Sequence, residues 1–165
     1  MNRTEPVKAV FLDRDGVINH DPGDYTTCLD EFTILPGVIE TLKEFTERGY
    51  AVVVITNQGG IAKGRYPVRN FAEIDSYMRG EFEKAGVHYL DTYFCPHHDA
   101  VSKCLCRKPR SGMVEKAIAR HHINPQKSFM VGDKMRDLVA AAGAGVKGVK
   151  IDVNQDMRTV KFPFD

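Results

Sequence analysis

An apolar segment near the start of the chain, Val7 to Leu12, runs directly into Asp13-Arg14-Asp15-Gly16, and this run constrains the fold most strongly. A short, continuous apolar run bounded by chain-breaking residues is typical of a buried parallel strand. Asp13 and Asp15 would stand at its carboxyl end, where ligands bind in an open α/β sheet, and Gly16 allows a sharp turn after them. Paired carboxylates there can hold Mg²⁺, or supply a nucleophile beside an acid/base group, although solvated turns show the same pattern.

Further apolar runs alternate with segments of helical periodicity along the rest of the chain. Strands are expected at about residues 51–55, 92–94, 128–131 and 146–151. The alternation predicts one three-layer α/β domain over residues 1–165, with a Rossmann-like parallel sheet. In the helix after residue 131, the side chains expected to face the core are Met135, Leu138, Val139 and Ala142. Residues 152–165 lack a helical pattern and are expected to form either an edge strand or a tail.

The composition is that of an ordinary globular protein, with 42% hydrophobic residues, 27% charged residues and a net charge of +1. This balance gives no overall attraction to nucleic acid or to a membrane surface. No apolar stretch approaches the ~20 residues that span a bilayer, and the polar segment from Met1 to Pro6 does not resemble a signal peptide. We therefore expect a cytoplasmic monomer without a nucleic-acid or membrane partner.

Four possible metal ligands lie close together in the sequence: Cys95, His97, Cys104 and Cys106. In a chain without an export signal, this crowding favours a metal site over disulfides. Three thiolates and an imidazole suit tetrahedral Zn²⁺ in a closed structural site, with His98 as an alternative ligand and an accidental gathering of thiols as the alternative explanation. The metal would fix a short polar loop that carries Arg107 and Lys108. Cys28 stands alone and is expected to be an inert small residue.

Polar side chains follow four of the expected strands: Asp13 with Asp15, then Thr56, Cys95 and Asp133. A doubly wound sheet brings these strand ends to one edge. Carboxylates, a hydroxyl group and Lys108 form a set suited to phosphoryl transfer, because Mg²⁺ and lysine neutralise the phosphoryl oxygens while the hydroxyl group donates a hydrogen bond to them.

The order of these groups resembles the phosphatases of the haloacid dehalogenase superfamily. The four motifs that carry the resemblance are Asp13-Arg14-Asp15-Gly16, Thr56-Asn57, Lys108 and Gly132-Asp133-Lys134-Met135-Arg136-Asp137. The similarity runs from about residue 9 to residue 151. Within the superfamily, the runs 56–64, 95–97 and 104–109 are most similar to the D-glycero-D-manno-heptose-1,7-bisphosphate phosphatases and to the related histidinol-phosphate phosphatases.

The resemblance implies a mechanism through an aspartyl-phosphate. Asp13 would be the nucleophile, and Asp15 would protonate the leaving oxygen and then activate water. Thr56 and Lys108 would hold the transferring phosphoryl group. Mg²⁺ would be bound by Asp13, by the backbone carbonyl of Asp15 and by Asp133. Asp137 would either orient Lys108 or the metal-bound waters, or only cap its own helix.

Only a loop, one helix and one strand separate Asp13 from Thr56, which leaves no room for a cap domain, and the same holds between Thr56 and Lys108. We therefore expect an open site that acts on a small phosphorylated metabolite. The residues expected to bind this substrate are Arg14, Asn57, Gln58, Arg107 and Lys134, of which the last two could grip a distal phosphate or hydroxyl group. Selectivity would come from a flap after Gly16, the loop from Gly59 to Tyr66 and the zinc loop.

The resemblance favours removal of the C7 phosphate from a heptose bisphosphate. Histidinol phosphate is the alternative substrate, and a zinc-stabilised binding module without turnover is the alternative of another class. One departure concerns the flap, where Asp21-Pro22-Gly23-Asp24-Tyr25 stands in place of the family's compact Asp-His-Gly-Tyr loop.

Overall fold

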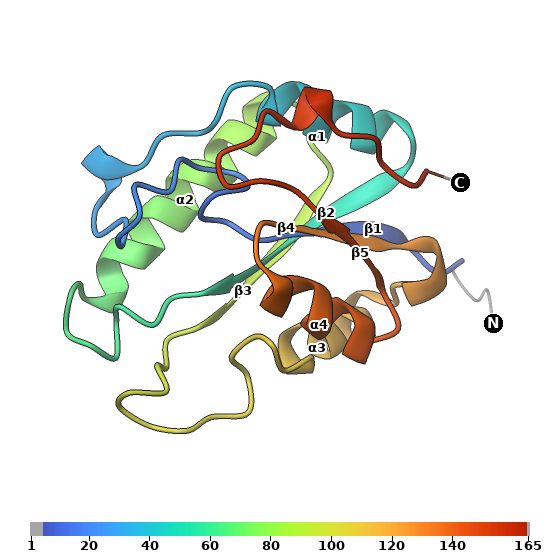
Figure 1. The fold of residues 1–165 in the computed structure, drawn as a ribbon. Coiled ribbons are helices and arrows are strands. Elements are labelled where there is room, and N and C mark those ends of the chain that lie inside the picture. The colour runs from blue at the N-terminus through green and yellow to red at the C-terminus, as the bar shows by residue number, and fades with distance from the viewer. Residues whose placement is uncertain (1–4, 165) are drawn as a thin grey trace.

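A parallel β-sheet forms the centre of the molecule in a computed structural model, which describes residues 5–164 (Figure 1). Its strands are β1 (Lys8–Leu12), β2 (Tyr50–Asn57), β3 (Tyr89–Cys95), β4 (Phe129–Gly132) and β5 (Lys147–Lys150). The α-helices are α1 (Val38–Glu47), α2 (Val68–Lys84), α3 (Gly112–His121) and α4 (Met135–Gly143), and the short 3-10 helices are η1 (Leu29–Glu31), η2 (Pro125–Lys127) and η3 (Met157–Thr159). The strand order β3-β2-β1-β4-β5, parallel throughout, confirms the predicted architecture.

The helices cover both faces of the sheet, so the domain has three layers (Figure 1). Alternate residues of a strand point to opposite faces, and β1 shows this directly. Val10 and Leu12 belong to the core beneath α1 and α2, whereas Ala9 and Phe11 belong to the core beneath α3 and α4. Because both faces are covered, β1 reads as a continuous apolar run rather than as an alternating one.

Helix α4 buries a different face from the one that its apolar residues predicted. Its buried residues are Asp137, Ala140 and Ala141, whereas Met135 is 63% exposed and Val139 is 51% exposed. Ala142 is also exposed and Leu138 is half-buried, so the predicted inward face through Met135, Leu138, Val139 and Ala142 was wrong. The face that turns inward carries Asp137, which contacts a buried lysine described below.

The segment after β5 forms no edge strand in the part of the chain that the structure describes, so β5 itself is the edge of the sheet. The segment contains η3, and the rings of Phe162 and Phe164 pack against Phe45 of α1 and Phe129 of β4. Of the two alternatives for residues 152–165, the structure therefore shows a tail that covers one face of the sheet; Asp165 lies outside the described residues.

The loops at the carboxyl edge of the sheet are short enough that residues 5–164 contain no inserted cap domain. Two hydrogen bonds tie the flap between β1 and α1, residues 17–35, to the tail. The backbone N–H of Asp21 donates to Asn154 Oδ1 (2.7 Å), and Asn154 Nδ2 donates to the carbonyl of Asp21 (2.9 Å). Within the same residues, no helix has the length and apolar character needed to cross a membrane.

Candidate active site

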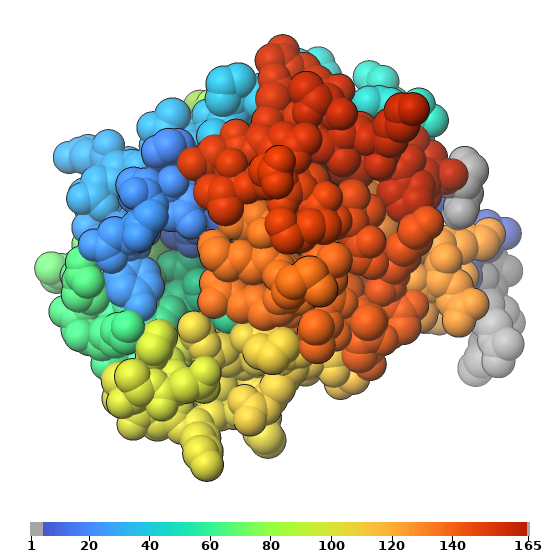
Figure 2. Space-filling model, viewed as in Figure 1, coloured from blue at the N-terminus to red at the C-terminus, as the bar shows by residue number. Residues whose placement is uncertain are grey.

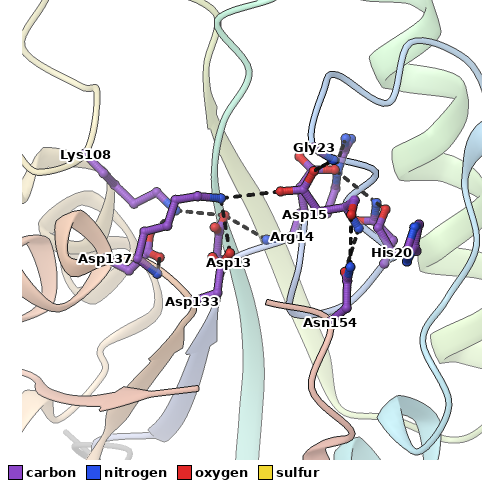
Figure 3. A network of polar contacts seen from close by, with 12 residues as sticks. Asp13, Arg14, Asp15, His20, Gly23, Lys108, Asp133, Asp137 and Asn154 are labelled. Carbon is purple, nitrogen blue, oxygen red and sulfur yellow. Dashed lines mark hydrogen bonds and ion pairs between the residues drawn. The ribbon is translucent and has the colours of Figure 1, made fainter. Parts of the chain in front are cut away.

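The carboxyl ends of β1, β2 and β4 bring the predicted polar side chains together. Asp13 directly follows β1, Thr56 lies near the end of β2, and Asp133 follows β4. Since β1 pairs with β2 on one side and with β4 on the other, Asp13 lies between the other two residues. Figure 3 shows that Asp13, Asp133, Asp137 and Lys108 gather at this edge.

Asp13 is a buried carboxylate, only 4% exposed. Its Oδ1 accepts hydrogen bonds from the backbone N–H of Arg14 (2.8 Å) and from Lys108 Nζ (2.8 Å). Burial raises the pKa of Asp13 to about 7, because the loss of solvation outweighs the opposing effect of the Lys108 charge, and the nearby Asp137 adds to the rise.

Lys108 lies at the centre of this cluster and is 1% exposed. Its Nζ lies 2.8 Å from Asp13, 2.7 Å from Asp137 and 2.7 Å from the backbone carbonyl oxygen of Ile55. Asp137 also accepts a hydrogen bond from the backbone N–H of Lys134 at the start of α4 (3.0 Å). Asp137 therefore both orients Lys108 and caps its own helix, so the two roles that the sequence offered as alternatives occur together.

Asp15 lies at the pocket wall, with a side chain that is 26% exposed. Burial favours its neutral form, but the Arg14 guanidinium and the hydrogen bonds from Arg14, Asn19 and Gln58 outweigh this effect and lower its pKa. Arg14 itself was expected to bind substrate. Its side chain is 1% exposed and donates to Asp15 Oδ1, and Arg14 is not among the residues that line the pocket, so a contact between Arg14 and substrate stays a prediction.

The residues at the end of β2 contact other parts of the site. The fully buried Thr56 accepts a hydrogen bond at Oγ1 from Gln58 Nε2 (2.9 Å). Asn57 was expected to bind substrate and does line the pocket, but its amide is occupied by the main chain of Lys108, to which it donates (3.1 Å) and from which it accepts (3.0 Å). Gln58 also donates to Asp15 Oδ2 (2.9 Å).

The carboxylates suit a divalent cation. Ligand oxygens of Asp13, Asp133 and Asp137 all lie within 4.8 Å of one another. Oδ1 of Asp133 is buried and has no hydrogen-bond partner among the described residues, which leaves it available for a metal ion. Gly16 has a φ of +85°, and a Cβ added to it would lie 2.7 Å from Asp133 Oδ2, so a side chain at this turn would collide with the cation site. Since Asp137 is already paired with Lys108 and with the backbone of Lys134, the carboxylates of this group that fit Mg²⁺ are those of Asp13 and Asp133.

The four predicted zinc ligands converge around one point. The Sγ atom of Cys95 lies 3.1 Å from that of Cys106 and 3.6 Å from that of Cys104. Nδ1 of His97 lies 3.3 Å from the Sγ of Cys106. A tetrahedral zinc site with bonds of 2.0–2.3 Å separates its ligand atoms by roughly 3.3–3.8 Å, whereas a disulfide would bring two sulfurs to ~2.05 Å. The cluster therefore fits a zinc site of three cysteines and one histidine, with His97 in preference to His98.

This cluster shapes a loop that lies against the turn after β2. Burial raises the pKa of the Cys95 thiol to about 12. Burial also acts on the Cys104 thiol, but hydrogen bonds from the backbone of Arg107 and Cys106 outweigh it and lower the pKa of that thiol. A Cβ added to Gly59 would lie 2.8 Å from the ring of His98 and 3.0 Å from Arg107 Nη1, which shows how closely the two loops approach. The zinc loop thereby delivers Lys108 to the buried cluster and Arg107 to the pocket wall.

An open pocket of about 520 Å³ leads to Asp13 and Asp15. In Figure 2 the hollow lies between the blue flap, the yellow zinc loop and the orange start of α4. Four of the predicted substrate residues line the pocket: Asn57, Gln58, Arg107 and Lys134. Nζ of Lys134 lies 3.1 Å from Asp133 and 3.4 Å from Asp21. Tyr25, Lys63, Arg65, His98 and Arg136 also line the pocket, although the sequence did not predict them as substrate-binding residues. All but Arg136, which lies in α4, belong to the segments expected to set selectivity, but no local pattern marks their side chains as pocket-facing.

Comparison with known proteins places this arrangement in a family. A model of haloacid dehalogenase-like hydrolases matches residues 7–145. The chain is 44% identical over 146 residues to the D-glycero-beta-D-manno-heptose-1,7-bisphosphate 7-phosphatase of Haemophilus ducreyi, which covers 85% of this chain and 80% of that protein. It is 41% identical over 151 residues to the enzyme of the same name from Escherichia coli K12, covering 88% of this chain and 78% of that protein.

Solved structures agree with the sequence comparison. The D,D-heptose 1,7-bisphosphate phosphatase of B. bronchiseptica, which contains magnesium and phosphate, superposes with a TM-score of 0.83 at 32% identity, covering 93% of this chain and 85% of that chain. A haloacid dehalogenase-like phosphatase of Mesorhizobium loti gives a TM-score of 0.79 at 33% identity, covering 88% and 72%. Fold, site and sequence thus agree, and the chain belongs to the haloacid dehalogenase-like hydrolase family.

Proposed function

We propose that this protein is a Mg²⁺-dependent phosphatase that removes the C7 phosphate from D-glycero-β-D-manno-heptose 1,7-bisphosphate. The proposal depends on one observation: a buried carboxylate lies at the base of a pocket whose wall carries cationic side chains. Asp13 lies beside Lys108 at the base of the pocket, and additional cationic side chains line the pocket above them. The names of the curated relatives support this substrate and this anomer.

The proposed reaction begins at Asp13. Its Oδ1 is occupied by Lys108 and by the backbone N–H of Arg14, so we assign Oδ2 as the oxygen that attacks phosphorus. The new bond forms as the bond between phosphorus and the C7 oxygen breaks, and the leaving oxygen takes a proton from the protonated form of Asp15, which the surrounding donors disfavour in the free protein. Asp15 then takes a proton from water, which attacks the aspartyl-phosphate and releases inorganic phosphate. Thr56 and Lys108 hold the phosphoryl oxygens during both steps.

Mg²⁺ would be held by the side chains of Asp13 and Asp133 and by the backbone carbonyl of Asp15. When bound, the ion offsets negative charge on the phosphoryl oxygens. Zn²⁺ would be held by the cysteine and histidine cluster described above and would have a structural task, because all four of its positions are taken by protein ligands.

The positive charge along the pocket wall favours a bisphosphate over histidinol phosphate as the substrate. Five cationic side chains line the pocket: Lys63, Arg65, Arg107, Lys134 and Arg136. Apart from the reacting carboxylates, the acidic residues in the lining are Asp21 and Asp24, which pair with Lys134 and Arg65. The remaining positive charge suits a second phosphate group, whereas the ammonium group of histidinol phosphate would be repelled.

The test is phosphate release by the purified protein, with Mg²⁺ and Zn²⁺, from both anomers of the heptose bisphosphate and from histidinol phosphate. We expect the highest kcat/KM for the β anomer, with loss of the C7 signal in ³¹P NMR spectra and no turnover by Asp13→Asn. A preference for histidinol phosphate would overturn the substrate assignment. Saturable binding of these phosphate esters without any Mg²⁺-dependent release would instead support the binding module.

We also infer that the protein works as a cytoplasmic monomer on a small phosphorylated sugar, without a nucleic-acid or membrane partner. The near-neutral net charge of +1 supports the second part of this inference. Light scattering coupled to size-exclusion chromatography tests the monomer, and a mass of twice 18.5 kDa would refute it.

A further inference from the structure

The carboxylate of Asp15 is held on two sides by protein donors. Its Oδ1 accepts hydrogen bonds from Arg14 Nη2 (2.8 Å), Arg14 Nε (3.2 Å) and Asn19 Nδ2 (3.0 Å). Its Oδ2 accepts from Gln58 Nε2 (2.9 Å). Donors on both oxygens fix the rotation of the carboxylate about its own axis as well as its position.

Arg14 is rigid enough to serve as one half of this arrangement. The side chain is 1% exposed, and its guanidinium carbon lies 5.8 Å from the ring centre of Phe32 and 5.9 Å from that of Phe71. A planar guanidinium held by packing presents its N–H groups in a fixed direction, which a flexible lysine ammonium would not do.

Gln58 forms the other half, and Tyr66 sets its orientation. An amide side chain can present either its oxygen or its nitrogen to a neighbour. The hydroxyl group of Tyr66 donates a hydrogen bond to Gln58 Oε1, which leaves the NH₂ group facing Asp15 and Thr56. Burial raises the pKa of Tyr66 to about 12, so the hydroxyl group keeps the proton that it donates.

Tyr66 is itself held between two loops. Its ring packs edge-on against Tyr25 of the flap, with ring centres 6.1 Å apart. A Cβ added to Gly60 would lie 2.3 Å from the Tyr66 ring and 3.1 Å from the Tyr25 ring, so the two rings sit directly over this turn. The orientation of Asp15 is thus connected to the loop between β2 and α2 and to the flap.

We propose that Arg14 and Tyr66 are positioning residues for the acid/base step: Arg14 directly, and Tyr66 through Gln58, hold Asp15 in the one orientation that reaches the leaving oxygen. This proposal rests on the proposed phosphatase function. Neither residue needs to touch the substrate. The contribution of each should therefore depend on how strongly the leaving group needs a proton.

The test compares two substrates that differ in their leaving group: the heptose bisphosphate, which expels a sugar alkoxide, and p-nitrophenyl phosphate, whose phenolate leaves without a proton. General acid catalysis contributes about 10²- to 10⁴-fold where it is needed, and partial misorientation removes part of this. Tyr66→Phe should lower kcat/KM for the sugar phosphate by about three- to tenfold. Its kcat/KM for p-nitrophenyl phosphate should stay within about twofold of the wild-type value, because kcat/KM reports formation of the aspartyl-phosphate, and p-nitrophenolate leaves in that step without a proton. The later use of Asp15 as a base is common to both substrates and does not enter kcat/KM.

The matched control is Tyr89→Phe. It also removes a tyrosine hydroxyl group, but this one is hydrogen-bonded to Thr92 on β3 and lies outside the pocket. It should lower the melting temperature about as much as Tyr66→Phe and leave kcat/KM unchanged for both substrates. Arg14→Lys, which keeps the charge but not the planar fork, should give a larger fall of at least about tenfold with the sugar phosphate, again sparing p-nitrophenyl phosphate.

Equal losses with both substrates in a folded Tyr66→Phe protein would overturn the proposal, as would no loss at all. Should Arg14→Lys fail to fold, Tyr66→Phe alone decides. If the wild-type protein prefers a different alkyl phosphate to the heptose bisphosphate, the heptose assignment is refuted. The comparison of leaving groups would remain valid with that preferred substrate.

Discussion

Replacing Lys108 by Met should destabilise the protein to an extent that depends on pH. Met preserves most of the side-chain volume but removes the ammonium group that lies 2.8 Å from Asp13 and 2.7 Å from Asp137. It also removes the hydrogen bond to the carbonyl of Ile55. Two carboxylates that are 4% and 0% exposed would then face each other without this cation between them.

The magnitude follows from the burial of these groups and from the pKa of Asp13. Removing one partner of a buried ion pair costs roughly 3–5 kcal/mol. Protonation of Asp13 limits this cost, because burial already raises its pKa to about 7 and the loss of Lys108 would raise it further. A carboxyl group with a raised folded-state pKa loses stability as pH rises from its unfolded pKa through its folded pKa.

The wild-type contribution of Asp13 therefore levels off once the pH passes about 7, whereas the variant goes on losing stability at higher pH. Each additional unit of pKa corresponds to about 1.4 kcal/mol. We expect the difference between Lys108→Met and wild type to be smaller at about pH 6 and to approach roughly 3–5 kcal/mol at about pH 9.

Urea denaturation in magnesium-free buffer that retains zinc measures both free energies of unfolding. The matched control is Lys127→Met, which removes an exposed lysine of η2 and should change stability little at either pH. A Lys108→Met protein as stable as this control, or one whose loss of stability is the same at both pH values, would refute the assignment of Lys108 as the counterion of Asp13.

Three further outcomes are expected. Cys106→Ser should abolish stoichiometric zinc in metal analysis and lower the melting temperature by ~5–10 °C, whereas Cys28→Ser should do neither; retained zinc would contradict the cluster. Gly59→Ala should raise KM about tenfold at unchanged zinc content, because its Cβ would lie 2.8 Å from His98 and push the zinc loop away from the pocket; steady-state kinetics checks this. The affinity for Mg²⁺ should fall below about pH 7, where a proton on the buried Asp13 competes with the ion; calorimetry that showed no change between about pH 6 and about pH 8 would contradict the raised pKa.

The sequence was sufficient to predict which polar side chains gather where the parallel strands end. The apolar run before Asp13, and the chemistry that follows the later strands, predicted a parallel sheet with Asp13, Thr56 and Asp133 at one edge, and the structure has this arrangement. The spacing of the cysteines predicted the cluster around His97. These features are local in sequence, or follow from the rule that parallel strands end at a common edge.

What the sequence did not reveal is the direction of individual polar side chains. Arg14 stands in a catalytic motif, yet it points away from the pocket because Asp15 and two aromatic rings surround it. Helix α4 buries Asp137, which pairs with Lys108, together with Ala140 and Ala141, and leaves larger apolar side chains exposed. Both cases depend on contacts with side chains from other parts of the chain, and the periodic pattern of apolar residues does not reveal such contacts.

The strand ends that hold the carboxylates and the loops that form the pocket wall are separate parts of the chain, which affects how substrate selectivity could change. The carboxylates proposed to react stand at strand ends, whereas the walls of the pocket come largely from the flap, the loop from Gly59 to Tyr66 and the loop of the cysteine and histidine cluster. Exchanging these walls between relatives would alter which ester is accepted while leaving the phosphoryl-handling groups in place. Lys108 is the exception, because it comes from the loop of the cysteine and histidine cluster but contacts Asp13 and Asp137 at the base of the pocket. On the proposed function, a loop transplanted from a relative would have to carry its own lysine at this position.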